Sequence, residues 1–348
     1  MSIARFESIG AFLPEKVLST QELMASMTNP QPIDVEAITG IKERRILDTH
    51  ENSLLAAVEA AKDCLSRSSY TAEDIDVVIS CSISRSKDSH QRNYFDPALS
   101  LFVKKELGLV NAFHFDVSNA CSGMMTGVHL LTEMIKAGVA KNGIVVSGEQ
   151  ISSIAMTAAL EIEQPWDPQF GSLTVGDSGA AVLIDSKGNE DDCIHYMELT
   201  SCVEYSELCI GKPSDKTPAY ALYTNNDQMH KKERLSLWPH FHQKLLEKQG
   251  TTFAEEGFDY IVQHQVGLKF VEKVNMVGSA HFETDMPPAI NSVENFANTA
   301  TTSHFIALYT HLKENKLAPK TKILFVPAAS GMVTGCLSAT FTNLEVSS

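Results

Sequence analysis

The main candidate for a catalytic residue in this sequence is a cysteine surrounded by small residues. Cys121 lies in SNACSGMMTG, between a strand-like stretch and a helical one, beside Ala120, Ser122 and Gly123. Small residues permit a tight turn, and a thiol at a helix N-terminus feels the positive end of the helix dipole, which favours the thiolate. A thiolate attacks a thioester and holds the acyl group as a new thioester. Cys121 is therefore predicted to be an acyl-accepting nucleophile, with a buried structural cysteine as the alternative.

Two polar residues much further along the chain suit the same chemistry. His264 lies at the end of a predicted strand in VQHQVG, and Asn298 lies in FANTATTS, before a predicted helix. A neutral imidazole and a side-chain amide are donors that can stabilise an enolate oxygen. The alternatives are a core or surface histidine and an asparagine that caps the following helix. For Asn298 the capping role and a catalytic role are compatible, because only the direction of the amide decides between them.

An internal duplication provides the elements that must position these three residues. Each half runs through a helix, a strand, a second helix, a loop, a third helix and a second strand. These elements are expected at 54–65, 74–83, 96–108, 124–138 and 141–150 in the first half, and at 241–249, 258–266, 266–278, 304–316 and 320–330 in the second. Matching order of this kind predicts a duplicated α/β fold of βαβαβ-like halves, with buried strands and helices on both faces.

The duplication also predicts where the candidate residues lie. We expect an N-terminal half, 1–190, that carries Cys121, and a C-terminal half, 191–348, that carries His264 and Asn298. Equivalent loops of a duplicated fold approach each other across a pseudo-twofold axis, so the three side chains should converge. Residues 151–220 interrupt the repeat and are expected to form loops over the site.

Three further segments suggest supporting roles. PAASGMVTGC near the C-terminus could bring backbone N–H groups of Ser330 or Gly331 to the nucleophile, or could be a plain bend between strands. The basic group in GIKERR (Lys42, Arg44, Arg45) is either a solvated face or a contact for phosphopantetheine or a carrier protein. GDSGAAVLID, residues 176–185, lacks the spacing of a phosphate-binding loop, and a supporting turn is the preferred interpretation.

The composition excludes several classes of protein. The chain has 348 residues, 43% of them hydrophobic, and a net charge of -15, so nucleic acid is not expected as a main partner. The N-terminus does not look like a signal peptide, and no apolar stretch approaches the ~18 residues of a membrane span, so a cytoplasmic protein is expected. The cysteines form no CxxC pair, so neither a disulfide framework nor a metal site is predicted. They are Cys64, Cys81, Cys121, Cys193, Cys202, Cys209 and Cys336.

The ordered trio of FDVSNACSG, QHQ and ANT resembles the β-ketoacyl-acyl-carrier-protein synthase III family, and the similarity extends from IGAFLPEKVLST to the last strand. The resemblance implies a thiolase-like fold of five layers, αβαβα, and a homodimer in which the strand around 111–118 pairs across a twofold axis. It implies that Cys121 accepts an acyl group. It also implies that His264 and Asn298 promote decarboxylation of a malonyl thioester, whose carbanion then attacks that acyl group. The substrates are carried by an acyl carrier protein or coenzyme A, and no other cofactor is expected.

The sequence departs from the family pattern at several positions. Asp34 and Ile38 stand near the places of the Trp and Arg that hold the coenzyme A adenine, and Asp96 replaces the usual Phe before Pro97. The usual PHQAN is QHQVG, with Gly267 in place of the last Asn, and the usual FGGG turn is PAASG. These departures indicate a specialised relative, in fatty-acid, polyketide or other secondary metabolism.

Two alternatives to Claisen condensation remain from the sequence. The first is an acyltransferase that moves the acyl group from Cys121 to an alcohol or amine. The second is a non-catalytic partner subunit of a heterodimeric condensing enzyme. The presence of Cys121, His264 and Asn298 together argues against the second, because an inactive partner need not keep all three.

Overall fold

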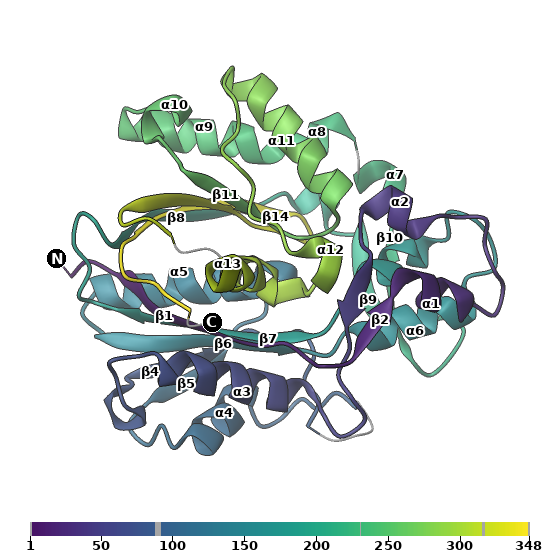
Figure 1. Ribbon diagram of the computed structural model, residues 1–348, viewed down its shortest axis with the longest axis horizontal. Coiled ribbons are helices and arrows are strands. Elements are labelled where there is room, and N and C mark those ends of the chain that lie inside the picture. The colour runs from purple at the N-terminus through teal and green to yellow at the C-terminus, as the bar shows by residue number, and fades with distance from the viewer. Residues whose placement is uncertain (1, 88–91, 230, 315–316, 347–348) are drawn as a thin grey trace.

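The computed structural model describes residues 2–87, 92–229, 231–314 and 317–346, and it contains two mixed β-sheets (Figure 1). Each sheet takes its strands from one part of the sequence. The first sheet has the order β1 (Arg5–Phe12), β7 (Ser178–Asp185), β6 (Asn142–Glu149), β4 (Val77–Ser80) and β5 (Phe113–Asp116). The second has β8 (Cys193–Ser201), β14 (Val333–Phe341), β12 (Thr321–Val326) and β11 (Tyr260–Gln263), with β13 (Ala328–Ala329) paired to β14.

Strand directions confirm that the two sheets repeat one another. In each sheet two antiparallel pairs, β1–β7–β6 and β8–β14–β12, are followed by a parallel pair, β6–β4 or β12–β11. The first sheet ends with the parallel strand β5. At the equivalent position the second sheet has a single parallel bridge, between Ile261 and Ala289. The predicted βαβαβ duplication is therefore correct.

Helices and sheets alternate in five layers (Figure 1). The helices α3 (Ser53–Ser66) and α4 (Leu99–Leu107) cover the outside of the first sheet. The helices α9 (Leu237–Gln249) and α11 (Leu268–Phe282) cover the outside of the second. Between the sheets lie α5 (Gly123–Lys136) and α13 (Ser303–Glu314), whose apolar side chains join both sheets in one core. This is the thiolase-like αβαβα arrangement.

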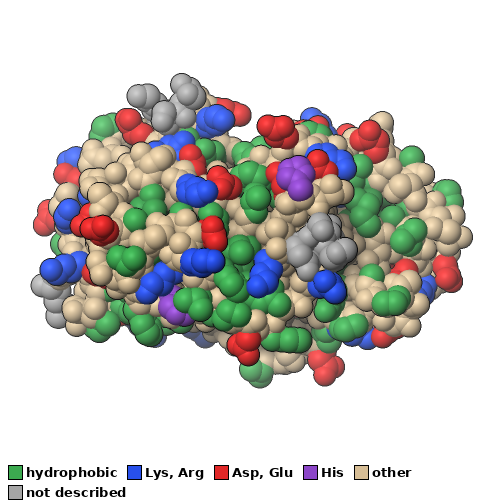
Figure 2. All heavy atoms as spheres, turned by 90° about the horizontal axis from the view of Figure 1, so that it is seen from below, with side chains coloured by type: hydrophobic (Ala, Val, Ile, Leu, Met, Phe, Trp, Pro, Cys, Tyr) green, Lys and Arg blue, Asp and Glu red, His purple; other side chains and the backbone are tan. Residues whose placement is uncertain are grey.

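Close packing of α3 on the first sheet explains two glycines in its strands. A Cβ on Gly148 would lie 2.0 Å from the carbonyl oxygen of Ser53, and a Cβ on Gly179 would lie 2.0 Å from that of Ala56. Side chains at these positions would push the helix off the sheet. The outward face of this layer carries acidic and basic side chains interspersed, so the excess negative charge is not gathered there (Figure 2).

Most of the remaining elements form a cap beside the layers, at the right of Figure 1. The others extend the helical layer above the second sheet. Together they are β2 (Val17–Ser19), α1 (Thr20–Ala25), α2 (Val35–Thr39), β3 (Glu43–Arg45), α6 (Ser152–Glu161), β9 (Cys209–Pro213), β10 (Tyr220–Thr224), α7 (Asn226–Met229), α8 (Lys232–Leu235), α10 (Phe253–Glu256) and α12 (Val293–Phe296). No helix among the described residues is long and apolar enough to span a membrane.

The expectation that 151–220 forms loops over the site is wrong for part of that segment. Residues 178–185 form β7, a fully buried strand between β1 and β6, because GAAVLID is an apolar run that needs pairing on both edges. The hairpin β9–β10 and the 3₁₀ segment Pro168–Thr174 do line the site. The division of the chain at residue 190 stays a prediction.

Candidate active site

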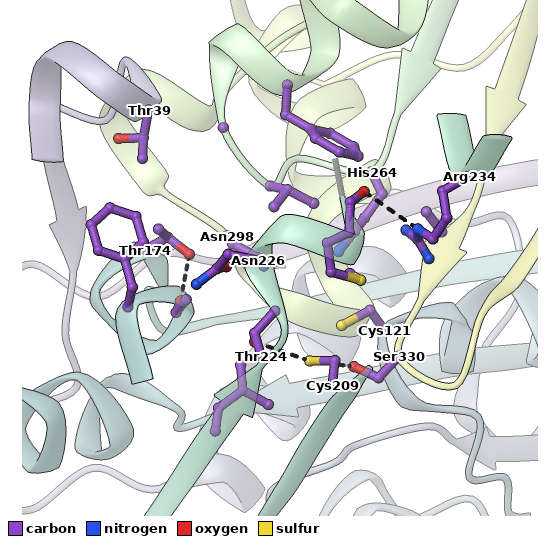
Figure 3. Close-up of a pocket in the computed structure, with 18 of the residues that line it drawn as sticks. Thr39, Cys121, Thr174, Cys209, Thr224, Asn226, Arg234, His264, Asn298 and Ser330 are labelled. Carbon is purple, nitrogen blue, oxygen red and sulfur yellow. Dashed lines mark hydrogen bonds between the residues drawn. The ribbon is translucent and has the colours of Figure 1, made fainter. Parts of the chain in front are cut away.

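A cavity of about 580 Å³ brings together residues from both halves of the chain (Figure 3). Cys121, His264, Asn298 and Ser330 all line it. Apolar side chains from the cap and from α11 form much of the remaining wall, among them Ile38, Trp166, Phe170, Leu222 and Phe270. The three chemical residues therefore converge on one cavity, as predicted.

A strained turn presents Cys121 to the cavity. Ala120 has a φ of 44°, in the left-handed region, and it begins the 3₁₀ turn Ala120–Ser122 that leads directly into α5. Positive φ is costly for a residue with a Cβ and persists only where the surroundings fix it. The turn places the cysteine at the start of the central helix, as its small neighbours predicted.

The equivalent turn in the second half corrects one detail of the predicted symmetry. Ala300, with a φ of 53°, begins the 3₁₀ turn Ala300–Thr302 before α13, so Thr301 is the positional counterpart of Cys121. Thr301 donates to Oε1 of the fully buried Glu149 at 2.6 Å. Asn298 lies at the same junction but three residues earlier, because the duplication aligns the turns and not the two chemical residues.

Backbone pairing and one side-chain bond fix the amide of Asn298. Its backbone N–H donates to Thr174 O at 2.9 Å, and its carbonyl accepts from Gly176 at 3.0 Å. Its Oδ1 accepts from the N–H of Ala300 at 3.0 Å. Because Oδ1 is occupied, Nδ2 is the part of the amide left to donate into the cavity. The capping alternative and a catalytic role are thus both compatible with this geometry.

His264 is held neutral by its surroundings. It is 5% exposed, and its Nδ1 lies 2.6 Å from the hydroxyl of Ser303, the first residue of α13. Burial, with a smaller effect from the neighbouring His304, lowers the pKa of His264 to about 3. The ring of His304 stacks at 5.7 Å and donates from Nε2 to Val326 O. A neutral imidazole with one nitrogen occupied by a hydroxyl leaves Nε2 for a substrate.

The environment of the Cys121 thiol differs from the expectation based on the helix dipole. Burial raises the pKa of Cys121 to about 12, and the nearby Cys209 and Glu149 act in the same direction. Backbone N–H groups of Cys121 and Ser330 oppose the shift by hydrogen bonding to the sulfur. Desolvation outweighs the dipole here, so the resting group is a thiol and not the predicted thiolate.

The C-terminal loop reaches the nucleophile through one of the two residues expected. Ser330 lines the cavity and its hydroxyl donates to Cys209 Sγ at 3.2 Å. Gly331 has a φ of 72° and forms the turn, but it does not line the cavity. The backbone of Ser330, and not that of Gly331, is therefore the candidate donor near an acyl oxygen.

The basic group of GIKERR does not form one binding surface. Arg44 is fully buried and donates to Leu173 O and Thr20 Oγ1, so its expected contact with a carrier is wrong: it organises the cap instead. Arg45 donates to Glu15 O at 3.3 Å and packs over Phe296. Lys42 pairs with Glu294 at 2.9 Å on the surface. None of the three basic side chains lines the cavity.

Sequence reasoning missed two residues of the site. Cys209 and Arg234 both line the cavity, on β9 and α8. Neither belongs to the repeat, and nothing in their local sequence marks them. Only the folding of the cap over the layered core brings them to Cys121.

Acid conditions should destabilise the folded chain through His264. Its pKa in the folded state, about 3, lies below the ordinary value of 6.5, so below pH 6.5 the unfolded chain binds a proton that the folded chain does not. Titration of His264 therefore leaves the free energy of unfolding unchanged above pH 6.5 and lowers it as the pH falls below that value. Between pH 7 and pH 5 we expect the wild type to lose about 2 kcal/mol more than His264→Asn. Urea denaturation at both pH values measures this, with exposed His240→Asn as the control. Equal losses in wild type and His264→Asn would contradict the prediction.

Comparison with known proteins places both halves of this site in one family. The family model of 3-oxoacyl-[acyl-carrier-protein (ACP)] synthase III matches residues 115–201, and the model of its C-terminal part matches 246–341. The first range includes Cys121, and the second includes His264 and Asn298. Together they cover just over half of the chain.

Curated relatives and solved structures agree over nearly the whole length. The chain is 24% identical over 338 residues to beta-ketoacyl-[acyl-carrier-protein] synthase III of Clostridium botulinum (strain Kyoto / Type A2), covering 94% of this chain and 95% of the relative. It is 26% identical over 344 residues to the enzyme of the same name from Clostridium perfringens, covering 96% and 98%. A structure of Xanthomonas campestris OleA matches with a TM-score of 0.80 at 21% identity, covering 98% of both chains. The 3-oxoacyl-[acyl-carrier-protein] synthase III of Aquifex aeolicus VF5 matches with a TM-score of 0.79 at 22% identity, covering 97% of this chain and 100% of that one.

Proposed function

Because the chain belongs to the 3-oxoacyl-[acyl-carrier-protein] synthase III family of acyltransferases, we propose that it joins two thioesters by decarboxylative Claisen condensation. Cys121 takes an acyl group from the first thioester. His264 and Asn298 then act on a malonyl-type thioester. The observation that carries this proposal is the convergence of these three side chains, from both halves of the duplication, on one cavity.

In the first half-reaction the Cys121 sulfur attacks the thioester carbonyl of the donor. The thiol must lose its proton as it attacks, since burial keeps it protonated at rest. The backbone N–H of Ser330, which already bonds to the sulfur, supports the negative charge that develops there or on the acyl oxygen. The carrier thiol leaves with the proton, and the acyl group remains on Cys121.

In the second half-reaction His264 and Asn298 bind the thioester oxygen of the extender. Nε2 of His264 and Nδ2 of Asn298 have no hydrogen-bond partner among the described residues and can donate to it. The extender loses carbon dioxide as its carboxylate C–C bond breaks, and the electron pair becomes an enolate that these donors stabilise. The enolate carbon attacks the acyl group, a C–C bond forms, and the Cys121 sulfur leaves as a thiolate that takes a proton from water.

Departures from the family pattern support a specialised role in fatty-acid or polyketide metabolism. Asp34 caps α2 by accepting from Ala37 and cannot stack on an adenine as an aromatic residue would. Ile38, near the expected arginine, lies in the wall of the cavity. The thioester is carried by an acyl carrier protein or by coenzyme A, and the cytoplasm is the proposed location.

Transfer of the acyl group to an alcohol or amine is the second candidate. It is favoured by Gly267, which lines the cavity where the family pattern has a second asparagine, so that the site lacks this second amide side chain. In that reaction His264 would take the proton of the acceptor.

Product analysis separates the two candidates. The protein is incubated with acyl-carrier-protein and coenzyme A thioesters, Cys121 acylation is followed by intact mass, and carbon dioxide release from malonyl thioesters is measured. Condensation requires both signals from the wild type. An ester or amide product without carbon dioxide release would favour the second candidate, and the absence of any acylation would remove both.

A homodimer should form through the open edge of the first sheet. β5 is an edge strand, and Phe113 on it is 64% exposed, as is Val110 just before it at 68%. An exposed apolar edge of this kind is suited to pairing with a second copy across a twofold axis. Light scattering at micromolar concentration should give twice the chain mass, and Phe113→Lys should shift the protein toward monomer. A wild type that is monomeric throughout would refute this.

A further inference from the structure

A buried arginine without an acidic partner reaches into the catalytic cavity. Arg234 on α8 is 6% exposed, and Figure 3 shows its guanidinium on the same side of the cavity as His264 and Cys121. Its Nε donates to Met229 O at 3.3 Å, whereas Nη1 is buried and has no hydrogen-bond partner among the described residues. Within the part of the chain that the structure describes, no carboxylate lies within ion-pair distance of this group.

An aromatic ring, and no carboxylate among the described residues, is what accompanies the charge of this side chain. The guanidinium lies 5.9 Å from the ring centre of Tyr205, and burial lowers the pKa of Arg234. An arginine nevertheless stays protonated in proteins. Asp227 lines the same cavity but is not paired with Arg234, and Glu233 points to solvent. A desolvated cation of this kind is strongly unfavourable unless an anion joins it.

We propose that Arg234 binds a free carboxylate on the acyl substrate, so that the enzyme prefers an acyl group with a distal carboxylate to a simple fatty acyl group. This inference rests on the proposed transfer of an acyl group to Cys121. A guanidinium forms paired, charge-assisted hydrogen bonds with a carboxylate. The Arg234 side chain lines the cavity, and its Nη1 has no hydrogen-bond partner among the described residues. The apolar wall formed by Leu222, Phe270 and Met332 suits the methylene groups between the two ends of such a substrate.

The chemistry of condensation indicates which of the two thioesters carries this carboxylate. The extender loses its own carboxylate as neutral carbon dioxide. An ion pair with Arg234 would stabilise that carboxylate before the reaction and would oppose its loss. A carboxylate that is retained in the product does not meet this objection. The donor that acylates Cys121 is therefore the substrate assigned to Arg234.

Matched donors test the assignment. Glutaryl-pantetheine and pentanoyl-pantetheine have acyl chains of equal length, differ in the terminal carboxylate and lack the phosphate of the natural carriers. Acylation of Cys121 by each donor is followed by intact mass in the wild type, Arg234→Met and Arg234→Lys. We expect the wild type to prefer the glutaryl donor at least tenfold, Arg234→Met to reverse the preference, and Arg234→Lys to keep part of it. The ratio of two donors within one protein is insensitive to general damage to the fold.

Each outcome bears on the proposal. Equal donor ratios in the wild type and Arg234→Met would overturn it. If Arg234→Met also raised the KM for malonyl-pantetheine, the arginine would instead bind the carboxylate of the extender.

A binding measurement separates this inference from the proposed function. If no donor acylates Cys121, the proposed function fails. Arg234 is then tested with an analogue of glutaryl-pantetheine that keeps the terminal carboxylate and has an amide in place of the thioester, so that it cannot transfer its acyl group. The analogue should raise the Tm of the wild type and leave that of Arg234→Met unchanged, and equal shifts in both proteins would refute a carboxylate site.

Discussion

Cys121→Ala should lose acyl labelling completely and should lose condensation by a factor on the order of 10⁴ or more, as removal of a covalent nucleophile does. The variant has no atom that can form the thioester, and the other cysteine of the cavity, Cys209, lies on β9 and not at the strained turn before α5. Intact mass after incubation with acyl thioesters measures labelling, and product formation measures condensation.

Cys209→Ala is the matched control, because it removes a thiol from the same cavity. It should keep acyl labelling. Labelling that persists in Cys121→Ala and vanishes in Cys209→Ala would identify Cys209 as the nucleophile. Iodoacetamide gives an independent check: Cys121 should react far faster than Cys64 and Cys81, which are fully buried in the core and away from the cavity. Because burial raises the pKa of Cys121 to about 12, its alkylation rate should still be rising at pH 10.

Asn298→Ala should retain acyl labelling of Cys121 but lose carbon dioxide release by about 10²- to 10³-fold, the usual effect of removing one donor to a developing oxyanion. The Asn298 amide is fixed by Ala300, so its Nδ2 is positioned before substrate arrives. Labelling should change little, because the first half-reaction uses the Cys121 sulfur and the backbone of Ser330. The decisive measurement is the ratio of the two half-reactions in one protein.

Asn226→Ala serves as the control for this variant, since Asn226 also lines the cavity but belongs to α7 in the cap. It should leave carbon dioxide release close to that of the wild type. If Asn298→Ala released carbon dioxide at the wild-type rate, stabilisation of the enolate by its amide would be excluded, and transfer to oxygen or nitrogen would become the better account. Simultaneous loss of labelling and decarboxylation would indicate that Asn298 only supports the turn before α13.

The sequence by itself was sufficient for the repeat and for the order of its elements. Hydrophobic periodicity located the helices around 54–65 and 304–316, of which 315 and 316 lie outside the described residues, and the strands around 141–150 and 320–330. It could do so because burial on one stripe or on both faces leaves a local pattern. The trio Cys121, His264 and Asn298 was also visible, because each lies at the end of a repeated element, where equivalent loops must meet.

Only the tertiary structure decided how charge is placed around that trio. The state of the Cys121 thiol depends on desolvation, which comes from residues distant in sequence and outweighs the local helix dipole. The same distinction applies to the two arginines. Arg44 seemed exposed in its basic segment but is buried in the cap, whereas Arg234 carried no local signal yet lines the cavity without an acidic partner among the described residues. Periodicity is a property of neighbours along the chain, but burial and pairing of a charge are set by elements that meet only after folding.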